Sequence, residues 1–288
     1  EKYFGYKSFR RGQEKIIDEI LRGKDVLAIM PTGGGKSLCY QIPALILDGI
    51  TIVISPLISL MKDQVDTLNS MGIDSAFLNS SLSTYEFNEV MNGIENKKYK
   101  IIYVAPERLH SNEFITAITQ VKIAQVAIDE AHCVSQWGHD FRISYKGIST
   151  FIDKLIERPI ITAFTATASQ EVRNDIVNLL RLNNPKIFVT GFDRENLRIN
   201  VIKGIEKKKF LLNYIKNNSK NSGIIYAATR REVDSLYELL KKNNINVGRY
   251  HAGLSNDERI KCQEEFINDE TNVIVATNAF GMGIDKPN

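Results

Sequence analysis

Short runs of apolar residues alternate along the chain with longer segments in which apolar positions recur at helical spacing. The runs are rich in β-branched side chains and apolar throughout, which is typical of parallel strands buried on both faces. The longer segments fit helices that cross over between such strands. The expected strands are residues 26–30, 51–55, 100–105, 126–129, 160–165, 222–226, 247–250 and 272–276. The pattern predicts an α/β fold with doubly wound parallel sheets.

Three of the expected helices have a recognisable start. Ser83, Thr229 and Ser255 each stand three residues before a glutamate. This is the spacing of a capping box, in which the hydroxyl and the glutamate each bind a backbone N–H of the first helical turn. We therefore expect a helix to begin directly after each of these three residues.

The alternation of strands and helices restarts once, after a polar and highly charged stretch at residues 193–209. A chain of 288 residues is long enough for two domains, because single cores stop growing at roughly 250–300 residues. We expect a first domain at 1–192, a linker at 193–196 and a second domain at 197–288. The second of these is short for its type.

The composition is that of a globular protein, with 43% hydrophobic and 25% charged residues. No apolar run approaches the roughly 20 residues of a membrane-spanning helix, and no charged-then-apolar leader opens the sequence. We expect no membrane contact, and a cytoplasmic location in a prokaryote or a nuclear one in a eukaryote. Cys39, Cys133 and Cys262 form no C-x-x-C pair, which argues against a zinc cluster and favours packed thiols.

The net charge of +3 is compatible with nucleic-acid binding but does not by itself indicate it. Phosphate binding would have to come from local groups, such as backbone N–H groups and helix N-termini. Lysine runs at 97–100 and 207–209 are expected to be solvated faces rather than DNA grooves.

A glycine-rich segment directly follows the first expected strand and directly precedes a helix. Glycines let backbone N–H groups converge on a pyrophosphate, Lys36 would neutralise the β- and γ-phosphates, and the Ser37 hydroxyl would reach Mg²⁺. Met30 stands where the first glycine of such loops is usual. The strand–loop–helix context favours a nucleotide-binding loop over an incidental turn. The predicted phosphate-binding residues are Thr32, Gly33, Gly34, Gly35, Lys36 and Ser37.

The expected strand at 126–129 ends in two adjacent carboxylates and a histidine. Open α/β sheets bind ligands at the carboxyl ends of their strands. Asp129 would hold Mg²⁺ there through water, and Glu130 would accept or orient the proton of the attacking water. The alternative is an ordinary polar strand exit, with His132 as a turn residue. The phosphate loop upstream favours the catalytic interpretation.

Residues 129–132 resemble the DEAH-type box of superfamily-two helicases, and the run Asp-Glu-Ala-His-Cys-Val-Ser-Gln-Trp-Gly-His-Asp-Phe-Arg at 129–142 resembles RecQ helicases specifically. The phosphate loop, extended to Ala44, is similar to theirs as well. Ile143 departs from the family, which usually has proline there. Further motifs follow in the family's order at 4–13, 55–65, 103–109, 164–168, 224–230, 250–254 and 275–287.

The resemblance implies two tandem RecA-like domains, the second incomplete at its C-terminal end, with ATP and Mg²⁺ bound between them. It also implies an ATP-dependent DNA helicase that translocates 3′-to-5′ on single-stranded DNA. Such helicases unwind duplex and branched DNA in recombination and repair. No protein partner is implied. The family's next motif carries arginines that reach the γ-phosphate and would lie beyond Asn288, so we expect this chain to hydrolyse ATP poorly by itself.

Several residue roles come only from the resemblance. Tyr6 would stack on adenine, while Arg10 and Gln13 would bind the nucleotide. Thr165 would lie in the motif that couples hydrolysis to movement. Residues of the last motif would reach the ATP site, and these are Gly283 and Asp285.

The loop after the carboxylates combines aromatic rings with a guanidinium. Aromatic side chains stack on unpaired bases with little sequence preference. Composition alone favours packing of Trp137 and Phe141 in the core, whereas the resemblance implies contact with DNA and control of hydrolysis. The residues expected to couple nucleic acid to hydrolysis are Gln136, Trp137, His139, Phe141 and Arg142.

Two other functions remain open from the sequence. One is an RNA helicase of the DEAD type, which the motifs at 4–13 and 136–142 disfavour. The other is a nucleotide-dependent nucleic-acid-binding module without turnover. The rate of ATP hydrolysis with and without single-stranded DNA would discriminate these functions from a DNA helicase.

Overall fold

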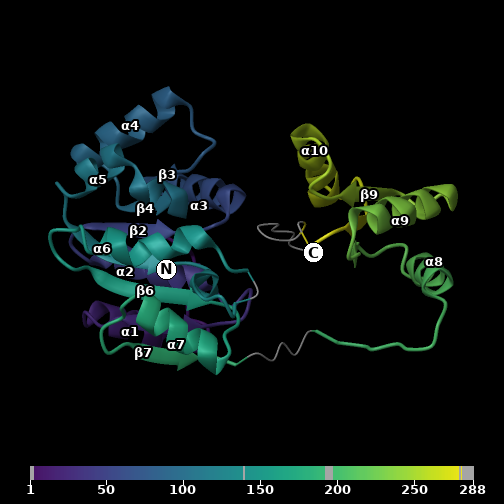
Figure 1. Cartoon of the computed structure of the whole chain (residues 1–288), viewed down its shortest axis with the longest axis horizontal. Helices are drawn as coiled ribbons and strands as arrows, with labels where there is room; N and C mark the ends of the chain where they lie inside the picture. The colour runs from purple at the N-terminus through teal and green to yellow at the C-terminus, as the bar shows by residue number, and fades with distance from the viewer. Residues whose placement is uncertain (1–2, 139, 192–196, 279, 281–288) are drawn as a thin grey trace. The chain divides into compact units, whose positions relative to one another are not determined.

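The chain divides into two compact units, unit 1 at Glu1–Arg194 and unit 2 at Glu195–Asn288 (Figure 1). The computed structural model describes residues 3–138, 140–191, 197–278 and 280. Several predictions lie outside these described residues, namely the linker at 193–196 and the site residues His139, Gly283 and Asp285.

Unit 1 is built on a seven-stranded sheet in the order β3-β4-β2-β5-β6-β1-β7, and every neighbouring pair is parallel. The central strands are buried at nearly every position, as expected for a sheet covered on both faces. The strands are β1 Val26–Ile29, β2 Ile50–Ile54, β3 Ser75–Leu78, β4 Ile101–Val104, β5 Ile123–Ile128, β6 Ile160–Thr165 and β7 Lys186–Val189.

Helices cover both faces of this sheet, and each face has its own hydrophobic core. The first three helices pack against one face and the next four against the other. Successive strand residues alternate between these cores: Val26 and Ala28 join one, Leu27 and Ile29 the other. The helices are α1 Gln13–Leu21, α2 Lys36–Ile46, α3 Ile58–Ser70, α4 Thr84–Glu95, α5 Asn112–Ile118, α6 Ile148–Ile152 and α7 Gln170–Leu179, with short 3₁₀ turns η1 Pro106–His110, η2 Ala131–Val134 and η3 Ile143–Gly147.

Two strands of unit 1 were not expected from the sequence. They are β3 and β7, which form the two edges of the sheet. Neither has the continuous β-branched run of a central strand, and most of β7 is exposed. Edge strands pack on fewer neighbours, so their hydrophobic pattern is weaker.

Unit 2 contains a three-stranded parallel sheet in the order β8-β10-β9. α8 and α9 pack against one face of it, and α10 packs against the other. α8 has no fully buried residue. The elements are α8 Lys207–Asn217, β8 Gly223–Tyr226, α9 Arg230–Lys242, β9 Val247–Tyr250, α10 Asn256–Ile267 and β10 Val273–Ala276.

The predicted α/β class with two doubly wound parallel-sheet units is confirmed. Helices begin where the cap residues predicted them, and Ser83 and Ser255 form complete capping boxes. At Thr229 the hydroxyl accepts a hydrogen bond from the Glu232 N–H. All three cysteines are buried free thiols, as expected. Among the described residues, no helix has the length and apolar character needed to cross a membrane.

Candidate nucleotide and nucleic-acid site

The glycine-rich loop connects β1 to α2, which begins at Lys36. Gly33 and Gly35 have φ of 77° and 79°, in the left-handed region that favours glycine. A Cβ on Gly35 would lie 2.3 Å from the Gln13 Nε2 atom. The loop therefore needs glycine at this position for its backbone angle and for the close approach of a side chain.

Two of the predicted nucleotide-binding residues hold this loop from α1 and the segment before it. Gln13 Nε2 donates to the Gly35 carbonyl oxygen at 3.0 Å, and the Arg10 guanidinium donates to the Gly33 carbonyl oxygen. The Arg10 N–H donates to Gln13 Oε1 at 2.7 Å. Tyr6, the third predicted nucleotide-binding residue of this segment, is 59% exposed.

The two predicted acidic residues lie where β5 ends. The Asp129 N–H donates to the Ile54 carbonyl oxygen of β2 at 2.8 Å, and the Asp129 side chain is buried. Burial raises the pKa of Asp129 to about 6, and the charge of Glu130 adds to the rise, while Lys36 opposes it. Glu130 has φ of 45°, and its Oε1 lies 3.7 Å from Lys36 Nζ.

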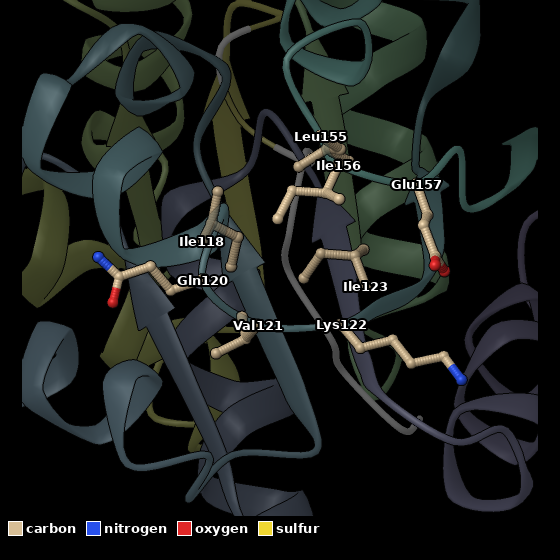
Figure 2. A pocket seen from close by; sticks show the side chains of 8 residues that line it. All are labelled: Ile118, Gln120, Val121, Lys122, Ile123, Leu155, Ile156 and Glu157. Carbon is tan, nitrogen blue, oxygen red and sulfur yellow. The ribbon is translucent and has the colours of Figure 1, made fainter.

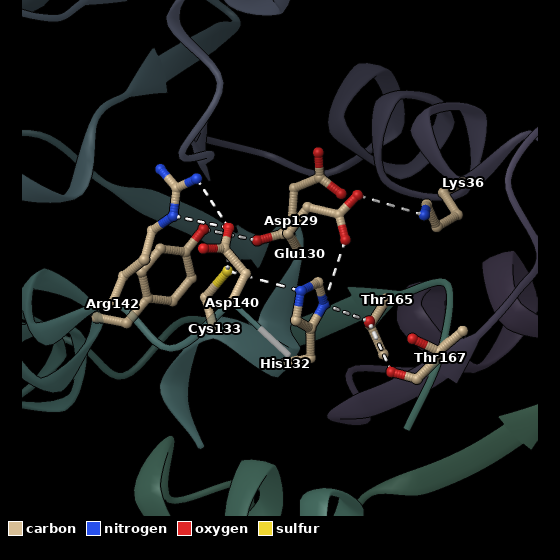
Figure 3. A network of polar contacts seen from close by, with 10 residues as sticks. Lys36, Asp129, Glu130, His132, Cys133, Asp140, Arg142, Thr165 and Thr167 are labelled. Carbon is tan, nitrogen blue, oxygen red and sulfur yellow. Dashed lines mark hydrogen bonds and ion pairs between the residues drawn. The ribbon is translucent and has the colours of Figure 1, made fainter. Parts of the chain in front are cut away.

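A histidine joins Glu130 to the end of β6 (Figure 3). His132 Nδ1 lies 3.3 Å from Glu130 Oε2 and 2.8 Å from Thr165 Oγ1. The Thr165 hydroxyl donates to the Thr167 carbonyl oxygen at 3.2 Å, so its oxygen accepts a hydrogen bond from His132. This assigns a proton to Nδ1 of the buried imidazole.

The donor set at the end of β5 fits Mg²⁺. Mg²⁺ prefers oxygen ligands and needs only one or two from the protein when phosphates and water supply the rest. Asp129 offers a buried carboxylate, and Ser37 offers a hydroxyl at the start of α2. In the described part of the chain, no group of three or more histidine, cysteine or acidic residues is arranged so that it could hold a metal ion by itself.

The loop after η2 is anchored at its end. Arg142 donates to Asp140 Oδ2 from Nε at 3.0 Å and from a terminal nitrogen at 2.8 Å. It also donates to the Pro56 carbonyl oxygen at 3.2 Å. The Cys133 sulfur lies 3.9 Å from Asp140 Oδ2 and 3.8 Å from His132 Nε2. Figure 3 shows these contacts extending from Lys36 to Arg142.

The side chains expected to reach nucleic acid differ in exposure. Gln136 is exposed and Trp137 is 79% exposed, so core packing of Trp137, which composition alone favoured, is wrong. Phe141 is partly buried, with Lys146 Nζ 5.4 Å from its ring centroid. An exposed indole on the loop that Asp140 and Arg142 anchor is available to stack on a base.

Comparison with known families gives a direct match over both units. The model of the DEAD/DEAH box helicase family matches residues 10–175, more than half of the chain, and that of the helicase conserved C-terminal domain matches 206–288. The chain belongs to the DEAD/DEAH box helicase family. The expected RecA-like fold and the motifs at 30–37 and 129–132 are therefore those of a helicase core.

Within this helicase family, the resemblance to RecQ is confirmed. The chain is 53% identical to the ATP-dependent DNA helicase RecQ of Bacillus subtilis over 99% of its own length and 49% of that protein. It is 45% identical to the protein of the same name from Haemophilus influenzae, over 99% of the chain and 46% of that protein. The chain thus spans about half the length of these relatives.

Solved helicase structures share the fold at low sequence identity. The helicase Lhr of Mycobacterium smegmatis, bound to single-stranded DNA and AMP-PNP, aligns with a TM-score of 0.73 at 17% identity, over 98% of this chain and 41% of that one. The DEAD-box helicase Mss116, bound to single-stranded RNA, aligns with a TM-score of 0.74 at 20% identity. The alignment covers 99% of this chain and 64% of that one. At these identities the likeness concerns the fold alone.

Some residues of this helicase site were not singled out from the sequence. Asp140 and Cys133 lie inside the quoted motif but had no assigned role, and the thiol pKa of Cys133 is raised to about 12 by burial. The Tyr145 hydroxyl donates to the Asp129 carbonyl oxygen at 2.9 Å. No sequence signal marks Tyr145, because its role depends on η3 folding back beneath the end of β5.

A cavity lies elsewhere in unit 1 (Figure 2). It has a volume of about 260 Å³ and is lined by apolar residues such as Ile118 and Ile123 together with the charged Lys122 and Glu157. Ile123 begins β5, whereas Asp129 follows its end. The cavity therefore lies at the amino ends of the strands, whereas the phosphate loop lies at their carboxyl ends. It is not the nucleotide site.

Proposed function

We propose that this chain is the motor core of an ATP-dependent DNA helicase that translocates on single-stranded DNA and unwinds duplexes, driven by Mg²⁺-dependent ATP hydrolysis. One observation carries the proposal: a continuous set of contacts joins Lys36, Glu130 and His132 to Thr165. The set connects the phosphate loop to the ends of β5 and β6. The names of its RecQ relatives support DNA as the substrate.

The contact between Lys36 and Glu130 suggests how nucleotide binding prepares hydrolysis. Lys36 is mostly buried and lies 3.7 Å from Glu130 in this structure. A γ-phosphate in the loop would attract Lys36 away from the carboxylate. Without the contact to Lys36, Glu130 would take the proton of the attacking water, as a general base.

Asp129 and Ser37 would hold Mg²⁺. When bound there, the ion would neutralise charge on the β- and γ-phosphates. The raised pKa of Asp129 reflects a carboxylate buried without enough positive charge beside it. Arg10 and Gln13 would keep the loop in shape while contacting the nucleotide, with Tyr6 available to stack on its base.

Coupling to nucleic acid would run through two branches that meet at His132. One leads through Thr165 to Thr167, in the motif at 164–168. The other leads through Cys133 and Asp140 to the loop that carries Gln136, Trp137 and Phe141. Single-stranded DNA stacked on the exposed Trp137 would then affect the position of Glu130, the residue that activates water. The 3′-to-5′ polarity, branched DNA substrates and roles in recombination and repair follow from the RecQ resemblance.

The test is steady-state ATP hydrolysis with no nucleic acid, with single-stranded DNA and with single-stranded RNA. It is run on this chain and on a version extended to the length of its relatives. We expect DNA to stimulate hydrolysis and RNA not to. Lys36→Ala should abolish the stimulated rate.

Stimulation by RNA would instead favour an RNA helicase, a function named for one relative from Acanthamoeba polyphaga mimivirus that is 42% identical over 99% of this chain and 52% of its own length. Nucleotide binding without hydrolysis in either form would favour a binding module.

A further inference from the structure

Positive charge is concentrated on and around α8. Residues 203–220 contain six lysines and one glutamate, a net charge of +5, whereas the whole chain carries +3. The remaining residues therefore sum to a slightly negative charge. The six lysines are Lys203, Lys207, Lys208, Lys209, Lys216 and Lys220.

These lysines are exposed, and the one acidic residue among them, Glu206, directly precedes Lys207. All six lie in the most exposed class of residues. None of them forms an ion pair with a carboxylate in the described part of the chain. By contrast, Lys122 pairs with Asp48 at 2.9 Å. The charge around α8 is thus available to an outside anion.

Two aromatic rings stand among the lysines. Phe210 is 38% and Tyr214 is 56% exposed. They lie one helical turn apart and stack, with ring centroids 5.8 Å apart and an angle of 29° between the planes. The opposite side of α8 packs on the core of unit 2 through Leu211, Leu212 and Ile215. The rings therefore face outward on a helix that already has its core contacts.

We infer that the α8 surface, defined as Lys207, Lys208, Lys209, Phe210 and Tyr214, binds single-stranded nucleic acid. The inference rests on the proposed function, which supplies the polymer. Lysines neutralise backbone phosphates, and exposed aromatic faces stack on unpaired bases without reading sequence. The lysine run alone predicted a solvated face; the stacked rings and the missing carboxylate partners change that interpretation.

The same features disfavour a membrane surface. A helix that lies on a membrane buries a broad apolar face in it. On α8 the apolar face is already used by the core of unit 2, and only two rings remain outside. Phosphates with unpaired bases match what is left.

Binding of a fluorescent oligo-dT to the chain, measured by anisotropy over a range of salt, tests the charged part. In Lys207→Gln/Lys208→Gln/Lys209→Gln we expect about tenfold weaker binding and a salt slope smaller by about 2, since each phosphate contact on a single strand contributes about 0.7. The matched control is Lys24→Gln/Lys97→Gln/Lys98→Gln. It removes the same charge from exposed sites that precede β1 and β4. These sites lie at the amino ends of the strands, whereas the phosphate loop lies at their carboxyl ends.

The aromatic part is tested by Tyr214→Leu, which keeps an apolar side chain but removes the ring. We expect about five- to tenfold weaker binding, within the range for one stacked base. Tyr85→Leu is the control, because Tyr85 is also exposed and lies on α4 of unit 1. Thermal unfolding of each variant shows whether the fold is kept.

Four outcomes are possible. Losses confined to the α8 variants support the inference. Equal binding by all variants, or equal losses in α8 and control variants, overturns the α8 surface while the helicase proposal stands. A wild-type chain that binds no single-stranded DNA overturns both.

Discussion

In unit 1 every residue of β1, β2 and β4 is buried, whereas in unit 2 the residues of β8 alternate between half-buried and exposed. Ile224 and Tyr226 of β8 are 40% and 57% exposed. The sheet of unit 1 has a large core on each face, while the cores of unit 2 are small. Unit 1 therefore has the larger hydrophobic core on which polar side chains of a site can be held in place.

Two buried histidines of the described residues, one in each unit, lie in different surroundings. In unit 1, His132 donates from Nδ1, because the Thr165 hydroxyl is already committed to a carbonyl. In unit 2, His251 Nδ1 accepts from the Gly253 N–H at 3.1 Å, and Nε2 lies 3.3 Å from Asp234. His132 lies within a network that reaches the phosphate loop, and His251 stabilises a turn. The surroundings decide the role of each imidazole.

The largest effect should come from the network of unit 1. In the version extended to the length of the relatives, Glu130→Gln removes the proposed base and should lower ATP hydrolysis by about 10²–10⁴-fold, with nucleotide binding retained. Steady-state hydrolysis and equilibrium nucleotide binding measure the two effects. Glu157 lines the cavity at the amino ends of the strands in the same sheet, so Glu157→Gln should leave hydrolysis unchanged. Equal losses in both variants would contradict the assignment.

The unequal burial predicts unequal costs of truncation. Phe151 is buried and stacks on Phe114 with centroids 5.8 Å apart. Phe151→Ala should reduce the free energy of unfolding by about 3–5 kcal/mol. Ile224→Ala, at a half-exposed position, should cost below about 1 kcal/mol. Urea titration followed by circular dichroism gives both values, and similar losses would show that unit 2 is better packed than its exposure indicates.

The three thiols report on the units separately. Burial raises the pKa of Cys39 and Cys133 to about 12 and that of Cys262 to about 11. Near pH 8 few of them are thiolate, so the folded chain should react slowly with iodoacetamide. As urea increases, Cys262 of unit 2 should react before the other two. Mass spectrometry of the labelled peptides measures the order, and earlier labelling of Cys39 or Cys133 would reverse the comparison.

The smallest effect should be the same in both units. Ser83 and Ser255 each form a complete capping box at the start of a helix. Ser83→Ala and Ser255→Ala should each reduce the free energy of unfolding by about 1 kcal/mol. Ser219→Ala, at an exposed serine that caps no helix, is the control. A cost in only one unit would show that caps depend on the surrounding core.

The local signals predicted most of the fold. Central strands such as β2 and β4 were expected because burial on both faces requires an unbroken apolar run. Cap residues located the helix starts because their hydrogen bonds span only three residues. The edge strands β3 and β7 were missed because an edge needs no such run.

The motifs predicted which residues carry the chemistry, since glycine, lysine and carboxylate at fixed spacing have few other uses after a strand. Their arrangement depended on the tertiary structure. His132 and Thr165 are 33 positions apart and meet because β5 and β6 pair in parallel, which brings their carboxyl ends together. Gln13 reaches Gly35 because α1 packs beside α2. Periodicity describes one element at a time, whereas these contacts arise only after separate elements pack together.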